Sequence, residues 1–283
     1  MLDFEGFPYP FERIQFGENL SSMPKGKPAG ESRRWRCLCS YDGTDFAGWQ
    51  KQPNGLAVQD RIEHALGEIF GQVIRTVGAG RTDAGVHADG QVFHFDGPWQ
   101  HSCTSMLQAI RSKLPAGISP LEIIPAKPNF HALSSAKGKR YRYRAIRGWA
   151  KPRDERFAHS LKNRRIDCEK INQAVGFFIG EHDFTAFSAN RGAVEQSSVR
   201  KVWKVKLTEK NELIEFVVEG EGFLYKMVRS MVGALLDVGS GKMEPSEIEQ
   251  ILQSCIRTER VVSAPAKGLS LEKVFYRKPR VVE

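Results

Sequence analysis

The chain has 283 residues, of which 41% are hydrophobic and 10% aromatic, and its formal net charge at pH 7 is +9. This apolar content is sufficient for a sizeable packed core and excludes low-complexity disorder over most of the length. Because no run of apolar residues is long enough to cross a bilayer, a membrane-spanning helix is excluded as well.

Residues 1–31 are expected to form a flexible N-terminal extension. Acidic residues outnumber basic ones there, and Pro, Gly, Ser and Lys recur from Ser21 to Ser32, a composition typical of linkers. The segment lacks the basic start and apolar stretch of an export signal. The folded part is expected in two halves, 32–150 and 151–283, because Gly, Pro and charged residues cluster around residue 150.

Hydrophobic periodicity predicts the elements of the first half. Apolar residues recur at helical spacing after Val58, and this spacing predicts an amphipathic helix over 58–70. A second helix is expected over 106–114, stopped by Pro115. Strands are expected over 35–41, 73–77, 91–95 and 121–124.

The second half repeats this mixture of elements. Helices are predicted over 171–178, 224–236 and 245–255, a hairpin over 202–207 and 213–218, and a last strand over 271–276. Apolar residues mark one stripe of the helix over 224–236. Two similar halves of strands and helices predict an α+β fold.

Most of the positive charge lies in one stretch. Between Lys137 and Arg165 there are twelve Lys or Arg and only two acids, Asp154 and Glu155. A polyanion is the expected partner of such a stretch, because each neutralised phosphate releases condensed counterions.

The stretch includes a strictly alternating segment over 139–146. As a strand, this segment places two tyrosines on one face and three arginines on the other. Arginine beside an aromatic ring suits phosphates and unstacked bases of RNA, and a core-facing tyrosine pair with a solvated basic back fits equally well. The arginines expected to contact the RNA backbone are Arg140, Arg142 and Arg144.

The most informative segment is the loop over 78–88, Gly-Ala-Gly-Arg-Thr-Asp-Ala-Gly-Val-His-Ala. Its three glycines permit positive φ and close backbone approach, and Arg81 and Asp83 project from it. A dinucleotide-binding loop is excluded, because Asp83 stands where that motif needs a glycine and would repel a pyrophosphate. An aspartate in such a loop also commonly caps a turn through its own backbone.

This loop resembles the signature of the tRNA pseudouridine synthase A family, and the resemblance extends over about 35–276. Further motifs follow in the order of the family: 41–50 with 58–59, 91–95, 130–132, 140–143, 180–187, 223–229 and 268–271.

The resemblance implies a fold of two similar α+β halves, each a mostly antiparallel sheet with helices on one face, with a catalytic cleft between them. It implies isomerisation of uridine to pseudouridine at positions 38–40 of the tRNA anticodon stem-loop, with no metal or organic cofactor. Family members act as homodimers, with tRNA crossing both subunits. Asp83 matches the essential aspartate of the family. Whether this aspartate adds to the sugar, adds to the base or removes a proton from the sugar stays open.

The resemblance also assigns four substrate-binding residues. Arg229 matches the partner of the aspartate, Tyr141 the tyrosine that contacts the base, and Leu269 an apolar pocket wall. Arg81 is placed to replace the rotated base in the stack or to hold its phosphate. The sequence pattern alone, without the resemblance, favours structural roles for the same residues. Arg229 would be an arginine at the edge of a helix, Tyr141 and Leu269 would be core residues, and Arg81 would stabilise the loop through an ion pair.

His87 and His94 are expected to be structural, because neither has a Cys or carboxylate at metal-ligand spacing. Ser230 stands where the family usually has Asn. The five cysteines are odd in number and scattered, which favours reduced thiols and a cytoplasmic location. Two other functions stay open: an RNA-binding protein or chaperone without catalysis, and a synthase acting on other RNA uridines.

Overall fold

The computed structural model describes residues 31–53, 55–189 and 197–278. The predicted flexible extension over 1–31 therefore lies outside the described residues, except for its last residue.

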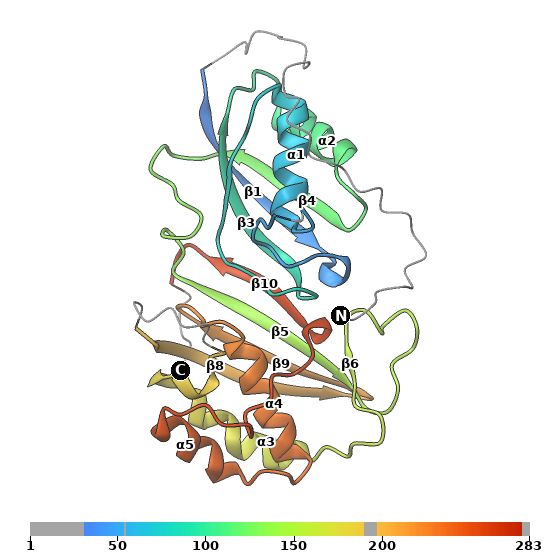
Figure 1. Cartoon of the computed structure of the whole chain (residues 1–283), viewed down its shortest axis with the longest axis vertical. Coiled ribbons are helices and arrows are strands. Elements are labelled where there is room, and N and C mark those ends of the chain that lie inside the picture. Colours follow the sequence, from blue (N-terminus) through green and yellow to red (C-terminus); the bar gives the residue numbers. More distant parts are fainter. Residues whose placement is uncertain (1–30, 54, 190–196, 279–283) are drawn as a thin grey trace.

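The described strands form one sheet with mostly antiparallel pairing (Figure 1). Two short strands lie off the main path, β2 (Thr76–Gly78) beside β3 and β6 (His159–Ser160) beside β5. The order along the main path is β4 (Ile118–Pro125), β1 (Arg33–Tyr41), β3 (His87–Gly97), β10 (Leu269–Phe275), β5 (Gly138–Ile146), β9 (Leu213–Gly220), β8 (Val199–Lys210) and β7 (Gly180–Asp183).

Strand β10 joins the two halves of the sheet. It pairs parallel with β3 and antiparallel with β5, while all other neighbours on the main path are antiparallel. Strand β5 precedes the predicted boundary at residue 150, yet its partners β9 and β10 both follow that boundary. The domain limits 32–150 and 151–283 stay a prediction.

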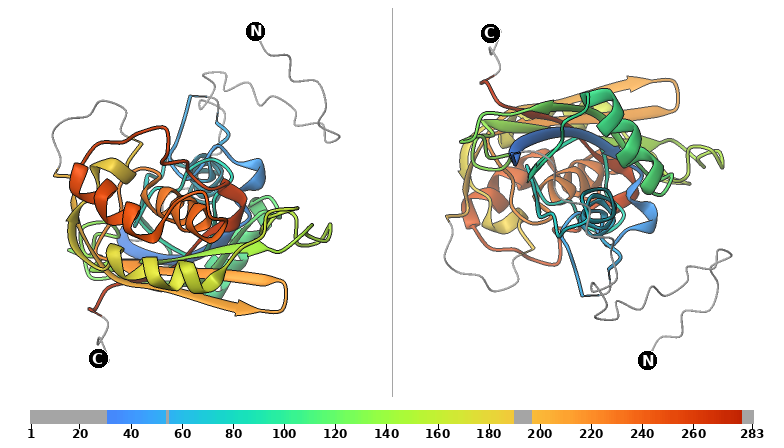
Figure 2. Two further views of the ribbon diagram at one scale, coloured as in Figure 1. Left: turned by 90° about the horizontal axis from the view of Figure 1, so that it is seen from below. Right: turned by 90° about the horizontal axis from the view of Figure 1, so that it is seen from above.

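Each half carries its own helices. The first half has α1 (Val58–Phe70) and α2 (Cys103–Lys113), and the second has α3 (Cys168–Ala174), α4 (Met227–Gly239) and α5 (Pro245–Ser254). Helices α1 and α4 lie on the same side of the sheet in both views of Figure 2. The predicted α+β class with helices packed on one face is confirmed.

The predicted alternation of β5 is confirmed. Tyr141 and Tyr143 are 7% and 0% exposed and belong to the core, whereas the three arginines that alternate with them, Arg140, Arg142 and Arg144, point to the other face. Helix α4 begins at Met227, three residues later than predicted, because Lys226 before it has the left-handed φ of 58°. The predicted helix over 171–178 is α-helical only as far as Ala174 and continues as a 3₁₀ turn.

Two properties of the described chain bear on its class. None of the helices in the described ranges is both long and apolar enough to cross a membrane. All five cysteines are free thiols.

Candidate active site

The loop between β2 and β3 carries Asp83 and is fastened to the first half. Gln91 of β3 donates to the Gly80 carbonyl over 2.8 Å, and the Ala79 amide donates to the Val92 carbonyl over 2.7 Å. The Thr82 hydroxyl meets the Tyr41 hydroxyl at 2.8 Å. These contacts fix the backbone on both sides of the carboxylate.

A second loop, 46–53, closes over the Asp83 loop. The Trp49 amide donates to the Thr82 carbonyl over 3.1 Å. Gly48 has a φ of +87°, and a Cβ there would lie only 2.5 Å from the same carbonyl oxygen. Position 48 therefore requires glycine for two reasons, the left-handed backbone and the close approach of the Thr82 carbonyl.

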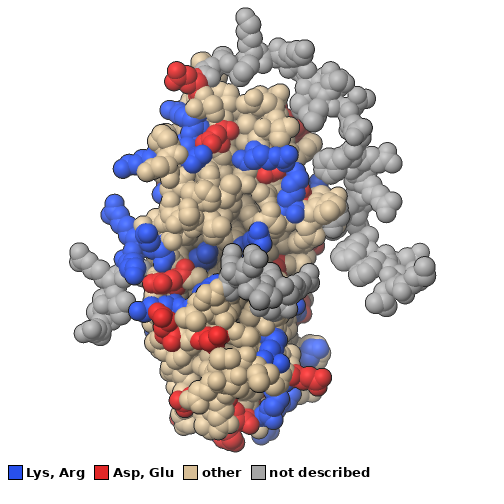
Figure 3. All heavy atoms as spheres, turned by 60° about the vertical axis from the view of Figure 1, so that its left-hand side comes forward, with Lys and Arg blue, Asp and Glu red and all other residues tan. Residues whose placement is uncertain are grey.

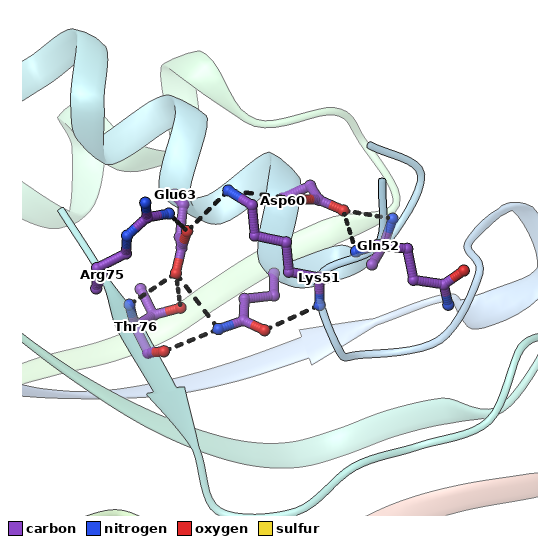
Figure 4. Close-up of polar contacts among 8 residues, drawn as sticks. Lys51, Gln52, Asp60, Glu63, Arg75 and Thr76 are labelled. Atoms are coloured by element: carbon purple, nitrogen blue, oxygen red, sulfur yellow. Dashed lines mark hydrogen bonds and ion pairs between the residues drawn. The ribbon is translucent and has the colours of Figure 1, made fainter. Parts of the chain in front are cut away.

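Helix α1 holds this second loop through a buried polar network, shown in Figure 4. Glu63 is 7% exposed and accepts hydrogen bonds from Lys51, Arg75 and the Thr76 amide. Asp60, also 7% exposed, accepts from the Gln52 amide. The single negative charge of Glu63 is paired with two cations, as a buried carboxylate requires a partner, and the network ties loop 46–53 to α1.

Asp83 meets Arg229 across the junction of the two halves. One guanidinium nitrogen, Nη1, donates to Asp83 Oδ2 over 2.8 Å, and the two side chains are only 18% and 13% exposed. The Asp83 backbone carbonyl accepts from the Val86 amide in a turn. Among the described residues, no hydrogen bond reaches the second carboxylate oxygen, Oδ1.

Arg229 is itself held in place from the side of the 261–264 segment. Its Nε donates to the Ala264 carbonyl over 2.8 Å, and the Ala264 amide donates back to the Arg229 carbonyl over 2.9 Å. Gly233 of α4 lets this segment approach, because a Cβ there would lie 1.9 Å from the Val262 carbonyl oxygen. The guanidinium therefore has a fixed direction toward Asp83.

Tyr141 lies next to this ion pair. Burial, followed by the negative charge of Asp83, raises the pKa of the Tyr141 phenol, so the phenol stays protonated at pH 7 and can donate a hydrogen bond. Its ring meets Phe223 edge to face, with centroids 5.3 Å apart. The predicted group of Asp83, Arg229 and Tyr141 is thus brought together from three separate segments.

The two other predicted pocket residues take different positions. Leu269, 5% exposed, begins β10 and pairs with Tyr143 of β5. The turn before it touches the Asp83 loop, because a Cβ on Gly85 would lie 3.3 Å from Ala266 Cβ. Arg81 is exposed, with no ion pair to any other described residue.

The three arginines of β5 lie on the opposite face of the strand from Tyr141 and form a ladder with three glutamates. Arg140 pairs with Glu219 and Glu272, Arg142 with Glu272 and Glu215, and Arg144 with Glu215. Arg142 and Arg144 also line a cavity of about 240 Å³, apart from Asp83. Their assignment to the RNA backbone stays a prediction, since the ladder balances three positive charges with three negative ones.

Both histidines have structural contacts. The Nδ1 atom of His87 accepts from the Gly43 amide over 3.0 Å, and Nε2 lies 3.1 Å from the Lys267 carbonyl. The Nδ1 atom of His94 accepts from the Ala132 amide over 3.1 Å. Within the described ranges, no group of three His, Cys, Asp or Glu side chains is arranged to hold a metal ion.

Sequence reasoning missed the polar group behind Arg229. The Ser230 hydroxyl meets the Ser263 hydroxyl at 2.9 Å, and Arg257 donates to Ser230 and to the Val261 carbonyl. These contacts fasten the segment that leads to Ala264. The departure from the family pattern at Ser230 was the available signal, but its partners lie about 30 residues further along the chain.

Comparison with known proteins agrees with this geometry. A family model described as tRNA pseudouridine synthase matches residues 38–133 and 174–277. A chain of a solved Cbf5-Nop10-Gar1 complex matches 84% of this chain and 48% of its own length, but at 13% identity and a TM-score of 0.35, which is too low to support an inference.

Curated relatives named tRNA pseudouridine synthase A match nearly end to end. Those of Exiguobacterium sibiricum, Brevibacillus brevis and Syntrophotalea carbinolica are 37%, 38% and 39% identical to this chain. The matches cover 86%, 86% and 88% of this chain and 97%, 100% and 98% of the respective relatives. The chain therefore belongs to the tRNA pseudouridine synthase family.

Proposed function

We propose that the protein isomerises uridine to pseudouridine in the anticodon stem-loop of tRNA, at positions 38–40, with Asp83 as the catalytic carboxylate. The observation that carries this proposal is the asymmetric setting of Asp83. Arg229 holds Oδ2, while Oδ1 has no hydrogen bond from the described residues. A carboxylate fixed through one oxygen presents the other to a reacting nucleotide in a defined direction.

The reaction needs few groups, because it conserves every atom. The bond between C1′ and N1 of uridine breaks, the base turns, and C1′ joins C5, which loses its proton while N1 gains one. Asp83 acts on the nucleotide as nucleophile or base. Tyr141, kept neutral by burial and by the charge of Asp83, contacts the base as a hydrogen-bond donor, and Leu269 supplies an apolar wall.

A uridine inside a helix cannot reach Asp83 and has to rotate out of its stack. Arg81, exposed and two residues before Asp83, is placed to fill the vacated position or to hold the adjacent phosphate. The loop that carries Arg81 is fixed by the contacts of Gly80 and Thr82, so the arginine extends toward RNA from a fixed backbone.

The test is release of tritium from tRNA labelled at C5 of uridine. Asp83→Asn should lower the rate at least about 10³-fold, while tRNA still binds. Asp89→Asn is the matched control and should keep wild-type turnover, because Asp89 is exposed and, of the described side chains, only Ser270 donates a hydrogen bond to it. Turnover by the Asp83→Asn variant would disprove the assignment. If the Asp83→Asn variant binds RNA more tightly than the wild type, and the wild type itself shows no turnover, the protein is an RNA-binding protein without catalysis.

The family resemblance supports three further proposals: the protein acts as a homodimer, in the cytoplasm, and without a metal or organic cofactor. Sedimentation at micromolar concentration tests the first, and a monomer with full activity would contradict it. Full turnover after dialysis against a chelator is expected. Mapping pseudouridines in cells lacking the protein would show whether positions 38–40 are the ones modified.

A further inference from the structure

Lys139 of β5 lies beside the proposed catalytic group. It is two residues from Tyr141 and therefore shares its face of the strand, which we call the site face. Its stem crosses the Asp83 loop: a Cβ on Gly80 would lie 2.8 Å from Lys139 Cε and 3.6 Å from Nζ. The absence of a side chain at Gly80 thus gives the ammonium group its place next to this loop.

The positive charge of Lys139 has no partner among the described residues. Burial, and then the positive charge of Arg200 of β8, lowers the pKa of Lys139. Within the described part of the chain, the Arg200 guanidinium donates only to backbone carbonyls, those of Ser197 and Val199, over 2.6 and 2.7 Å. Two adjacent cations without an acid are unfavourable unless an anion joins them.

Strand pairing explains how Arg200 comes near Lys139 although β9 lies between their strands. Lys139 pairs with Gly220 of β9, and Gly220 pairs with Val202 of β8, two residues from Arg200. Gly220 has no side chain of its own, and the Phe223 ring packs over it, since a Cβ there would lie 3.1 Å from Phe223 Cζ. Gly222 lies on the same path, and a Cβ there would be 3.8 Å from the Arg200 side chain.

The two faces of β5 therefore differ in charge. On the far face, the ladder of arginines is matched by glutamates. On the site face, Lys139 has no acidic counterpart among the described residues. Figure 3 shows Lys and Arg side chains gathered at mid-height of the molecule, beside a hollow in its surface.

We propose that Lys139 and Arg200 form a binding site for a phosphodiester that flanks the target uridine. The proposal rests on the proposed function of Asp83. A nucleotide rotated out of its stack keeps its two flanking phosphates, which must lie near the site that receives the base. A phosphodiester supplies the missing negative charge and oxygen acceptors for both side chains, and it fixes position without reading sequence.

The first test measures tRNA affinity against salt concentration, with every variant in the Asp83→Asn background so that turnover does not interfere. Lys139→Gln keeps most of the stem but removes the charge. It should weaken binding at least about tenfold and reduce the salt slope by about 0.9, the value for one phosphate contact. Lys206→Gln is the matched control. It removes the same charge from an exposed lysine that pairs through Val217 with Arg142, on the far face, and should leave the slope unchanged.

The second test locates the phosphate. A synthetic substrate carries an uncharged methylphosphonate at the 5′ or the 3′ phosphodiester of the uridine that the wild-type enzyme converts. One of the two should weaken binding to the Lys139 protein about tenfold and leave binding to the Lys139→Gln variant unchanged. Additive losses at both positions, or equal slopes for the Lys139→Gln and Lys206→Gln variants, would overturn the proposal.

Arg200→Gln provides a second variant in case Lys139→Gln does not fold, and the same loss is expected from it. Lys139→Arg should restore most of the affinity, because it returns the charge. Failure of this proposal is distinguishable from failure of the proposed function. In the first case the wild type still releases tritium and only the binding data change, whereas in the second the wild type releases none.

Discussion

At the scale of single residues, the direction of one guanidinium determines how Asp83 is presented. Arg229 uses Nη1 for the carboxylate and Nε for the Ala264 carbonyl, both at 2.8 Å. A planar fork can meet both acceptors with one orientation, whereas an ammonium group on a flexible stem cannot reproduce that geometry.

We therefore expect Arg229→Lys to lower kcat/KM at least about 100-fold, with little change in tRNA affinity. Steady-state tritium release and a binding titration measure the two quantities. Arg260→Lys is a suitable control, because Arg260 is an exposed partner of Glu247 and its exchange should change neither. Wild-type turnover by the Arg229→Lys variant would mean that charge alone, and not the fork, is what Asp83 needs.

His94 makes stability depend on pH. Burial, with Arg34 and His131 nearby, lowers its pKa to about 4, while Asp96 acts weakly in the opposite direction. Between pH 6.5 and 4 the His94 imidazole is protonated in the unfolded chain but not in the folded protein. The free energy of unfolding therefore falls as the pH decreases, by at most about 3 kcal/mol. His94→Asn keeps an acceptor for the Ala132 amide and should remove this part of the loss. Denaturant titrations at several pH values measure the free energy of unfolding of both proteins. If it changes equally with pH in the wild type and in the His94→Asn variant, the prediction is wrong.

At the scale of elements, α4 and the 261–264 segment act as one support for Arg229. Gly233→Ala places a Cβ where the Val262 carbonyl now lies, 1.9 Å away. The segment has to move, so we expect a loss of stability of about 2 kcal/mol and a fall in turnover as the Ala264 contact weakens. Gly67→Ala in α1 is the control, because its Cβ meets only an ordinary 3.6 Å neighbour. This change should stabilise by about 1 kcal/mol. Wild-type stability of the Gly233→Ala variant would show that the segment is not packed as described.

The elements themselves were largely predictable, because periodicity within a segment records which face is buried. Helix α1 begins and ends where its apolar spacing begins and ends, and the alternation of β5 correctly separates tyrosines from arginines. The insertion of β10 between β3 and β5 was not predictable, since it depends on pairing between segments more than 120 residues apart. The motif predicted that Asp83 and Arg229 meet, but not the Ala264 carbonyl or the Ser230 contacts that hold the arginine.

At the scale of the whole molecule, charge counted along the chain differs from charge in space. The stretch from Lys137 to Arg165 carries a large positive surplus in sequence, but three of its arginines meet glutamates that lie 71 to 132 residues further on. No local count can include those partners. What remains unbalanced in that part of β5 faces the Asp83 side, which is why the phosphate site is inferred there.

This difference leads to a test of the arginine ladder itself. Hydrogen bonds with Glu272, and then with Glu215, raise the pKa of the Arg142 guanidinium, which is 26% exposed. Arg142→Gln leaves both glutamates with fewer partners, so we expect the free energy of unfolding to fall by about 1–2 kcal/mol, between the values for exposed and buried pairs. Because the carboxylates already balance the ladder, the salt slope of tRNA binding should change by much less than one unit.

The double variant Arg142→Gln, Glu272→Gln separates the two roles. It keeps the net charge of the chain and removes one of the two carboxylates that the single change leaves with fewer partners, so part of the lost stability should return. Denaturant unfolding and binding titrations at several salt concentrations measure both effects. If RNA instead runs over this face, both variants should lose about 0.9 of the slope regardless of net charge, and Arg142 would then contact the RNA backbone as the sequence predicts.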